Sequence, residues 1–317
     1  MEVAAFGRKA ADLERGIDAA FTTIEKVCCL MSYHDPQSDV SRMNREAFPK
    51  SVVVDPWTWQ VLHAAQQFAE QSDGAFNISI APSLVSWSYL PSLGYRVDHA
   101  ATWRHIFLRK NRRVFFSRQL IIDLGGIAKG FAVDRAVDAL KENGVESGIV
   151  NAGGDLRVFG PASQIVHLRH PCDPMRIGGA VRLRERAMAT SGIYFSARDF
   201  GRHRVSPIID GRTGRPSRIP ISVSVAAMDC MTADALTKIV FAWREKAAPL
   251  LARHRADAVL LERDGRHHGC FTHHATPATG LDSTEALAEI FSVRRVGSGF
   301  FERSGMGILE LSCCVAW

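Results

Sequence analysis

Apolar side chains recur every three to four positions near the start of the chain, which is the spacing of one buried helix face. This stripe runs over residues 13–31 and stops at a turn-rich segment, residues 32–36. A second helix is predicted to begin at residues 55–56, where an aspartate cap precedes a proline at the first helical position. A third helix is predicted over residues 127–143, because Gly144 is a typical C-terminal stop.

Short apolar runs elsewhere have the length and flanking residues of β-strands. Residues 106–108 and 114–116 flank a basic turn and predict a hairpin, and residues 120–122 predict a short buried strand. Residues 221–225 alternate apolar side chains with serine, as in a half-exposed strand. Further strands are predicted at residues 148–151, 156–159, 165–168 and 181–189.

A fourth helix is predicted to begin at Thr232, whose hydroxyl can accept a bond from a free N–H group of the first turn. Its core face would carry Leu236, Ile239, Val240 and Trp243. Helical and extended segments alternate without an internal repeat, a low-complexity segment or a linker. The sequence therefore predicts an α+β fold, a single interleaved domain of mixed or antiparallel sheet with packed helices.

Composition excludes several classes of protein. The 317 residues are 46% apolar and 23% charged, which is typical of a folded chain rather than a disordered one. No apolar run approaches the ~18 residues of a membrane span, so no transmembrane segment is expected. The first residues lack the basic and then apolar pattern of a secretory signal. We therefore expect a cytoplasmic protein, or an exported one if the start is truncated.

Charge and cysteine content narrow the function further. The 39 basic and 33 acidic residues give a net charge of +6, and the one dense basic cluster, residues 109–113, falls in the predicted hairpin turn. Nucleic-acid binding would need a longer basic stripe, so no nucleic-acid partner is expected. The seven cysteines form no C-x-x-C motif, which argues against a disulfide framework or a zinc site. Reduced thiols are typical of the cytosol.

Three glycine-containing turns follow predicted strands. Residues 123–134 read Asp-Leu-Gly-Gly-Ile-Ala-Lys-Gly-Phe-Ala-Val-Asp, and the helix that starts there would present free N–H groups to a phosphate, with Lys129 in its first turn. The alternative is a plain strand-to-helix turn. Residues 151–155 and 190–192 form the other two turns. Together they favour a ligand that lies along backbone, although no Rossmann fingerprint is present.

The segment 229–238 carries a possible metal site. Asp234 is expected in the first helical turn, and Thr237 and Lys238 share its face. A carboxylate and a hydroxyl are hard oxygen ligands of the kind that Mg²⁺ takes together with substrate phosphate. The alternative is an ordinary ion pair between Asp234 and Lys238, four residues apart, worth only ~0.3–0.5 kcal/mol.

In this order, the segments resemble the ApbE family, the FAD:protein FMN transferases, over roughly residues 20–265. The run Asp-Leu-Gly-Gly-Ile-Ala-Lys-Gly at residues 123–130 is the most specific part. The other matching segments are residues 31–33, 38–44, 74–77, Pro82, 151–155, 190–192, 208–216 and 233–236. Residues 31–297 would then form an ApbE-like domain, after a helical opening segment (1–30) and before a tail (298–317) that has no clear periodicity.

The resemblance implies an activity and a set of site residues. Family members split the pyrophosphate of FAD with Mg²⁺, attach FMN through its phosphate to a threonine of a target flavoprotein, and release AMP. By position, the resemblance implies Asp234 and Lys129 as catalytic residues. It implies metal binding by Gly126, Asp234 and Thr237, and FAD binding by Tyr33, Ala75, Phe76, Asn77, Asp123, Lys129 and Ile208.

The chain also departs from the family pattern. Pro207 stands where the family often has a histidine proposed to act in catalysis, and proline cannot move a proton. Lys238 stands where a metal-binding threonine is usual, and an ammonium has no lone pair to offer. We expect Thr237 to substitute for that ligand. Asn77 replaces an aspartate, and residues 4–8 are the nearest remnant of an opening strand that contacts flavin in the family.

Three functions remain after these departures. The first is a Mg²⁺-dependent transferase that moves FMN from FAD to a threonine or serine of a partner flavoprotein. The second is a catalytically impaired FAD-binding or flavin-carrier protein, because lost acid–base help typically costs ~10²–10⁴ in rate. The third is an FAD pyrophosphatase that hydrolyses without an acceptor.

Overall fold

The central element of the structure, a computed structural model, is a nine-stranded sheet in which neighbouring strands run antiparallel. The structure describes residues 1–194, 196–217, 221–270, 301–303 and 306–312. In this part of the chain the sheet has the order β16-β15-β14-β9-β6-β5-β1-β18-β17. Its strands are β1 (Glu2–Gly7), β5 (Ser147–Asn151), β6 (Leu156–Phe159), β9 (Ala187–Gly192), β14 (Ser222–Ala227), β15 (Asp257–Leu261), β16 (His267–Cys270), β17 (Phe301–Arg303) and β18 (Met306–Ser312).

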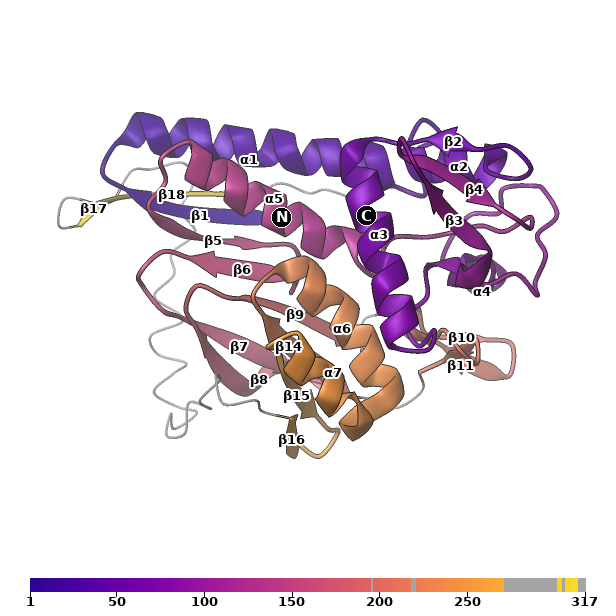
Figure 1. The fold of residues 1–317 in the computed structure, drawn as a ribbon. Helices are drawn as coiled ribbons and strands as arrows, with labels where there is room; N and C mark the ends of the chain where they lie inside the picture. Colours follow the sequence, from indigo (N-terminus) through magenta and orange to yellow (C-terminus); the bar gives the residue numbers. More distant parts are fainter. Residues whose placement is uncertain (195, 218–220, 271–300, 304–305, 313–317) are drawn as a thin grey trace.

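Three long helices cover one face of this sheet: α1 (Ala10–Met31), α5 (Ala128–Glu142) and α6 (Cys230–Trp243) (Figure 1). The apolar stripe of α1, which includes Leu13, Ile17 and Ile24, is buried against α5 and β1. Because each such aliphatic side chain contributes about 1.5–3 kcal/mol when buried, the stripe holds α1 on the sheet. Among the described residues, no helix is long and apolar enough to cross a bilayer.

A long hairpin of β7 (Gln164–His170) and β8 (Asp173–Leu183) packs against the other face. Alternate residues of β6 show the two faces, since Phe159 packs with the helices and Val158 packs with the hairpin. The expectation of a half-exposed strand at residues 221–225 is therefore wrong. Ser224 in β14 is only 4% exposed, and its hydroxyl bonds the Thr190 hydroxyl at 2.8 Å.

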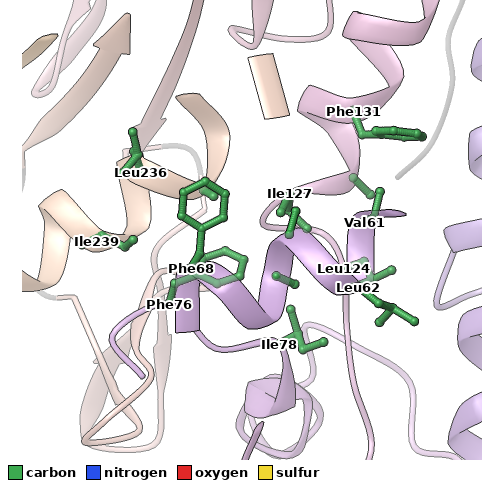
Figure 2. Close-up of a cluster of buried hydrophobic side chains, with 14 of the residues drawn as sticks. Val61, Leu62, Phe68, Phe76, Ile78, Leu124, Ile127, Phe131, Leu236 and Ile239 are labelled. Atoms are coloured by element: carbon green, nitrogen blue, oxygen red, sulfur yellow. The ribbon is translucent and has the colours of Figure 1, made fainter. Parts of the chain in front are cut away.

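A second group of elements lies beside the large sheet and joins it through a shared core. Figure 2 shows this core, in which apolar side chains of α3, of the turn before α5 and of α6 meet, among them Phe68, Ile127 and Leu236. The elements of this group are α2 (Asp39–Glu46), β2 (Val52–Val53), α3 (Pro56–Gln71), η1 (Ile78–Ile80), α4 (Ala81–Ser86), η2 (Trp103–His105), β3 (Ile106–Arg109) and β4 (Arg113–Phe116).

Short elements complete the described chain. The strands β2, β4 and β3 form a small antiparallel sheet in that order, which confirms the hairpin predicted around the basic turn. Two further hairpins lie between β9 and β14, and a helical pair follows α6. These elements are β10 (Arg198–Phe200), β11 (His203–Val205), β12 (Ile209–Asp210), β13 (Arg215–Pro216), η3 (Arg244–Ala247) and α7 (Ala248–Arg253).

Strands from both ends of the described chain pair with each other in the large sheet. The opening segment is helical only from Ala10, because residues 2–7 form β1 inside the large sheet rather than the remnant of a missing strand. The tail, which carried no structural prediction, supplies β18, and β18 pairs with β1 from Glu2↔Ser312 to Gly7↔Gly307. Residues 271–300 lie outside the described part of the chain.

Two predicted boundaries are also wrong. The strand expected over residues 181–189 is two strands, because β8 ends at Leu183 and β9 begins at Ala187 after a turn in which Glu185 has a left-handed φ of 50°. The cap of α6 is Asp229 rather than Thr232, since the Asp229 carboxylate accepts the Thr232 N–H at 2.8 Å. Asp234 consequently lies in the second turn of α6 instead of the first.

The buried segment at residues 120–122 forms no strand and belongs to no sheet, contrary to prediction. The side chain of Asn44 takes the place of a neighbouring strand. Its Oδ1 accepts the Ile122 N–H at 2.8 Å, and its Nδ2 donates to the Ile122 carbonyl at 3.0 Å. Asn44 is 1% exposed, so this pair of bonds satisfies backbone groups that have no water to bond.

The crossing of α5 and α6 is unusually close. A Cβ atom built on Gly130 of α5 would lie 2.3 Å from the Cys230 carbonyl oxygen of α6. The carboxylate of Asp134, one turn further along α5, accepts the N–H groups of Cys230 and Met231, both at 2.9 Å. Glycine at the contact and a carboxylate at the helix N-terminus together bring the start of α5 against α6.

Candidate active site

A cavity of about 430 Å³ opens where segments far apart in sequence meet. Its walls come from the end of α1, the loop after α3, the turn before α5, the end of β9, the start of β12 and one residue of α6. Every residue expected to contact flavin lines this cavity: Tyr33, Ala75, Phe76, Asn77, Asp123, Lys129 and Ile208. Gly126 lines it as well. The structure thus brings these residues together, and their flavin contacts stay a prediction.

The turn before α5 places a carboxylate on the cavity wall. The Asp123 N–H donates to the Ile78 carbonyl at 2.9 Å, which ties this turn to η1. The Asp123 carboxylate folds back and accepts the Gly125 N–H at 3.1 Å. Burial raises the pKa of Asp123, although the Gly125 N–H and the nearby His34 oppose the rise. The site therefore holds a carboxyl group whose affinity for a proton exceeds that of a solvated aspartate.

Two aromatic residues form the apolar wall. Tyr33 and Phe76 are 4% and 3% exposed, and burial raises the pKa of the Tyr33 hydroxyl. The Phe76 ring packs edge-on against Phe68, with centroids 6.0 Å apart, and Figure 2 shows these two rings together. The Tyr33 hydroxyl donates to the Pro91 carbonyl at 3.4 Å. Both rings are held in place before any ligand binds, which suits a flat apolar partner.

The side chain of Asn77 connects two segments of the cavity wall by hydrogen bonds. Its Oδ1 accepts the Ser79 N–H at 2.8 Å and so caps η1, while its Nδ2 donates to the Gly211 carbonyl at 3.3 Å. The Gly211 N–H in turn donates to the Ala75 carbonyl at 3.0 Å. The side chain of Asn77 thus joins the loop after α3 to the β12–β13 turn, and Ile208 at the start of this hairpin faces the cavity.

Two lysines and two aspartates form a compact cluster at the polar end of the cavity. Lys129, near the start of α5, pairs with Asp155, and Lys238 on α6 pairs with Asp234. Both lysines line the cavity, whereas Asp155 and Asp234 are 1% and 0% exposed. The close α5–α6 crossing holds the two pairs together, since the Gly130 N–H also donates to Asp234 at 3.3 Å.

The charges in this cluster depend on each other. Burial alone would raise the pKa of Asp234, but the ammonium groups of Lys238 and Lys129 hold it below its usual range. Burial would lower the pKa of Lys129, but the carboxylates of Asp155 and Asp234 raise it. Burial and the negative charge of Asp234 raise the pKa of Asp155. Lys129 therefore remains a cation at the cavity wall.

Thr237, expected as a metal ligand, is buried behind the cavity. Its hydroxyl donates to the Asp234 carbonyl at 2.7 Å and lies 2.7 Å from the Ser191 hydroxyl of β9. Its relative exposure is 0%, and it is not among the residues that line the cavity. These bonds orient the Thr237 oxygen toward its own helix and toward β9.

The residues around Asp234 do not fit a magnesium ion as they lie. The Lys238 ammonium donates a hydrogen bond to one oxygen of the Asp234 carboxylate, and the Gly130 N–H donates to the other oxygen. Mg²⁺ needs near-octahedral oxygen ligands, and each nearby carboxylate already faces an ammonium. Among the described residues, no group of three or more His, Cys, Asp or Glu is placed to hold a metal. Metal binding by Gly126, Asp234 and Thr237 stays a prediction of the resemblance.

Two further residues of note line the cavity. Pro207 lines the cavity, so the position that often carries histidine in the family does face the site. His34, which the sequence analysis did not select, lines the cavity as well, and its charge opposes the rise in the pKa of Asp123. Its position directly after Tyr33 was the signal that could have found it.

Comparisons with known proteins identify the family of this chain. The model of the ApbE family matches residues 1–261. The chain is 28% identical to the FAD:protein FMN transferase of Vibrio cholerae over 75% of its own length and 76% of that protein, and 29% identical to the one of Treponema pallidum over 82% and 80%.

Solved structures give the same answer for the fold. The ApbE protein of Thermotoga maritima superposes with a TM-score of 0.75 at 27% identity, covering 84% of this chain and 92% of that one. The apo flavinyl transferase ApbE of Pseudomonas stutzeri, at 22% identity and a TM-score of 0.69, supports the fold alone. The predicted α+β class is confirmed. Because the family model spans well over half of the sequence and the cavity is built from the motif segments, this chain belongs to the ApbE family.

Proposed function

We propose that this chain transfers FMN from FAD to a threonine or serine hydroxyl of a partner flavoprotein and releases AMP. The observation that carries the proposal is that one cavity has an apolar wall and a polar end. The wall has fixed aromatic rings at Tyr33 and Phe76, and the polar end has cations at Lys129 and Lys238. A flavin needs an apolar wall, and two linked phosphates need nearby positive charge. The relatives of the chain carry the name of this activity.

The reaction would be a phosphoryl transfer, in which positioning and charge neutralisation supply most of the catalysis. The acceptor hydroxyl oxygen forms a bond to the phosphorus on the FMN side, and the bond from that phosphorus to the bridging oxygen breaks. AMP leaves with the bridging oxygen and its electron pair, and the hydroxyl proton goes to water. Lys129 and Lys238 would bind the phosphate oxygens and offset their charge, while the wall of Tyr33 and Phe76 orients the flavin.

A test needs FAD, an acceptor and two readouts. Purified protein is incubated with FAD and a threonine-containing acceptor peptide, with Mg²⁺ in one arm and EDTA in the other, because Mg²⁺ dependence is a prediction of the resemblance. Mass spectrometry should show the peptide gaining FMN, and chromatography should show AMP in equal amount. The matched control is the same peptide with alanine in place of the threonine, which should gain nothing.

A second candidate function is favoured by Pro207, which faces the cavity without a group that can move a proton. In this case the chain binds FAD as a carrier and does not turn it over. Protein that stays yellow after purification, with no AMP and no modified peptide in either arm, would support the carrier over the transferase. FMN and AMP released without any acceptor would instead identify a pyrophosphatase.

A further inference from the structure

We infer that the Lys238 ammonium occupies the position of a divalent cation in this chain, so that Lys238 and Lys129 bind the linked phosphates of FAD without a metal ion. The inference rests on the proposed function, because it names how the same cavity recognises its substrate. It begins from the poor fit between the residues around Asp234 and a magnesium ion.

The position of Lys238 is the first support. Lys238 follows Asp234 by one helical turn of α6, and its ammonium lies on the Asp234 carboxylate. Its side chain is 18% exposed and lines the cavity, so the ammonium is held between a buried anion and the ligand space. A Cβ built on Gly126 would lie 3.6 Å from Lys238 Cε, which places the lysine stem against the turn expected to supply the metal's carbonyl ligand.

Charge balance is the second support. Lys129, Lys238, Asp155 and Asp234 are two cations and two anions, and their formal charges cancel. A divalent ion placed among them would lie beside two ammonium groups and would have to displace at least one of them. Like charges at such distances are costly in a partly buried site, where water screens them poorly.

The chemistry of lysine is the third support. An ammonium has three N–H donors and acts as a compact point charge that binds phosphate. Lys238 uses a donor on Asp234 and Lys129 uses a donor on Asp155, which leaves donors on both for a ligand in the cavity. The two buried carboxylates hold the ammonium groups in place, as they would hold a metal ion.

The direct experiment measures FAD binding by the unmodified protein, through quenching of flavin fluorescence, in EDTA and in Mg²⁺. The expected dissociation constants agree within about threefold, a difference of less than 1 kcal/mol. Calorimetric titration of the ligand-free protein with Mg²⁺ alone should show no saturable binding. Binding of FAD that requires Mg²⁺, or a saturable Mg²⁺ site in the ligand-free protein, would overturn the inference.

A variant should restore the metal requirement. Lys238→Thr places a hydroxyl one turn after Asp234 and removes the competing ammonium, so FAD binding should weaken by at least tenfold in EDTA and recover in Mg²⁺. Lys238→Met keeps the stem but offers neither charge nor ligand, so its binding should stay weak in both buffers. Lys110→Thr removes the same charge from the exposed β3–β4 turn and should bind FAD like the unmodified protein.

The outcomes separate this inference from the proposed function. Equal FAD binding in EDTA and Mg²⁺ without any transfer to an acceptor would refute the transferase and support the inference. Transfer that occurs only with Mg²⁺ would support the transferase and refute the inference. Absence of FAD binding in both buffers would refute both. If either Lys238 variant fails to fold, as judged by circular dichroism, the two measurements on the unmodified protein still decide.

Discussion

Replacing Gly130 by alanine should test how tightly α5 and α6 are joined beneath the cavity. The new Cβ would lie 2.3 Å from the Cys230 carbonyl oxygen, 2.6 Å from its carbonyl carbon and 2.8 Å from the Met231 Cα. All three are backbone atoms, so no side-chain rotation can relieve the contact. Since non-bonded heavy atoms prefer separations of about 3.5–4.0 Å, the helices must separate by about 1 Å.

The expected cost follows from opposing contributions. Alanine is a better helix former than glycine by about 1 kcal/mol, which alone would stabilise the variant. Overpacking of this kind costs about 1–3 kcal/mol. Separation of the helices would also stretch the two 2.9 Å bonds from Cys230 and Met231 to Asp134, and bonds to a charged group contribute about 1.5–3 kcal/mol each. We expect Gly130→Ala to lower the free energy of unfolding by about 2–4 kcal/mol.

Urea unfolding followed by circular dichroism measures this change as a lower midpoint at an unchanged slope. The matched control is Gly126→Ala, because its Cβ would meet Lys238 Cε and Phe76 Cε2 at an ordinary 3.6 Å. The control should stay within about 1 kcal/mol of the unmodified protein. If Gly130→Ala is as stable as the control, the close crossing of the two helices does not exist as described.

Substitutions at three further positions probe other buried groups. Asn44→Ala should cost about 2–4 kcal/mol in urea unfolding, because it leaves both backbone groups of Ile122 buried without partners; an unchanged midpoint would contradict this. Asp134→Ala should cost about 3–5 kcal/mol, and Asp134→Asn clearly less, since only the amide still offers an oxygen to the start of α6; equal losses would refute that role. Lys238→Met should leave Asp234 buried without its main cation, so its pKa rises above the unfolded value near 4. The stability deficit of this variant should therefore widen as pH rises from about 4 to 7, and a deficit independent of pH would refute the pairing.

Local pattern was sufficient for long helices such as α1 and α5, whereas the residues that gather around the cavity were found through the family resemblance. The stripe over residues 13–31 predicted α1 because one helix face is buried along its whole length. The prediction of α5 was confirmed to within a residue at each end, with Gly144 at a φ of 83° where glycine suits the left-handed turn. The cavity residues came from motif order, since periodicity alone cannot show that the ends of α1, β9 and β12 meet.

The errors have identifiable physical causes. The break between β8 and β9 went unseen because Glu185, rather than a glycine, adopts the left-handed conformation in the turn. The cap of α6 was misplaced because Asp229 and Thr232 are both good capping residues and bond each other. The residues 120–122 read as a strand because their apolar pattern does not reveal that Asn44, rather than a strand, bonds the backbone.

The interaction partners of the site residues were also only partly predictable from the sequence. Sequence spacing left open whether Asp234 binds a metal or pairs with Lys238, and the structure has the ion pair. Sequence spacing also gave no sign that Asp155 would form an ion pair with Lys129, because those two residues lie in different motif segments. Such contacts between distant segments are set by tertiary packing, which local sequence patterns do not show.

The wide spread of the cavity lining along the chain, from Met31 to Lys238, has a consequence for biosynthesis. No fragment that ends before Lys238 contains the whole ligand space. A nascent chain leaves the ribosome at roughly 5–20 residues per second. Most of the chain must therefore be synthesised before a ligand can contact all walls of the cavity. Ligand binding would thus be a late event in synthesis. A nascent chain that ends before Lys238 would lack part of the cavity and would bind the ligand weakly.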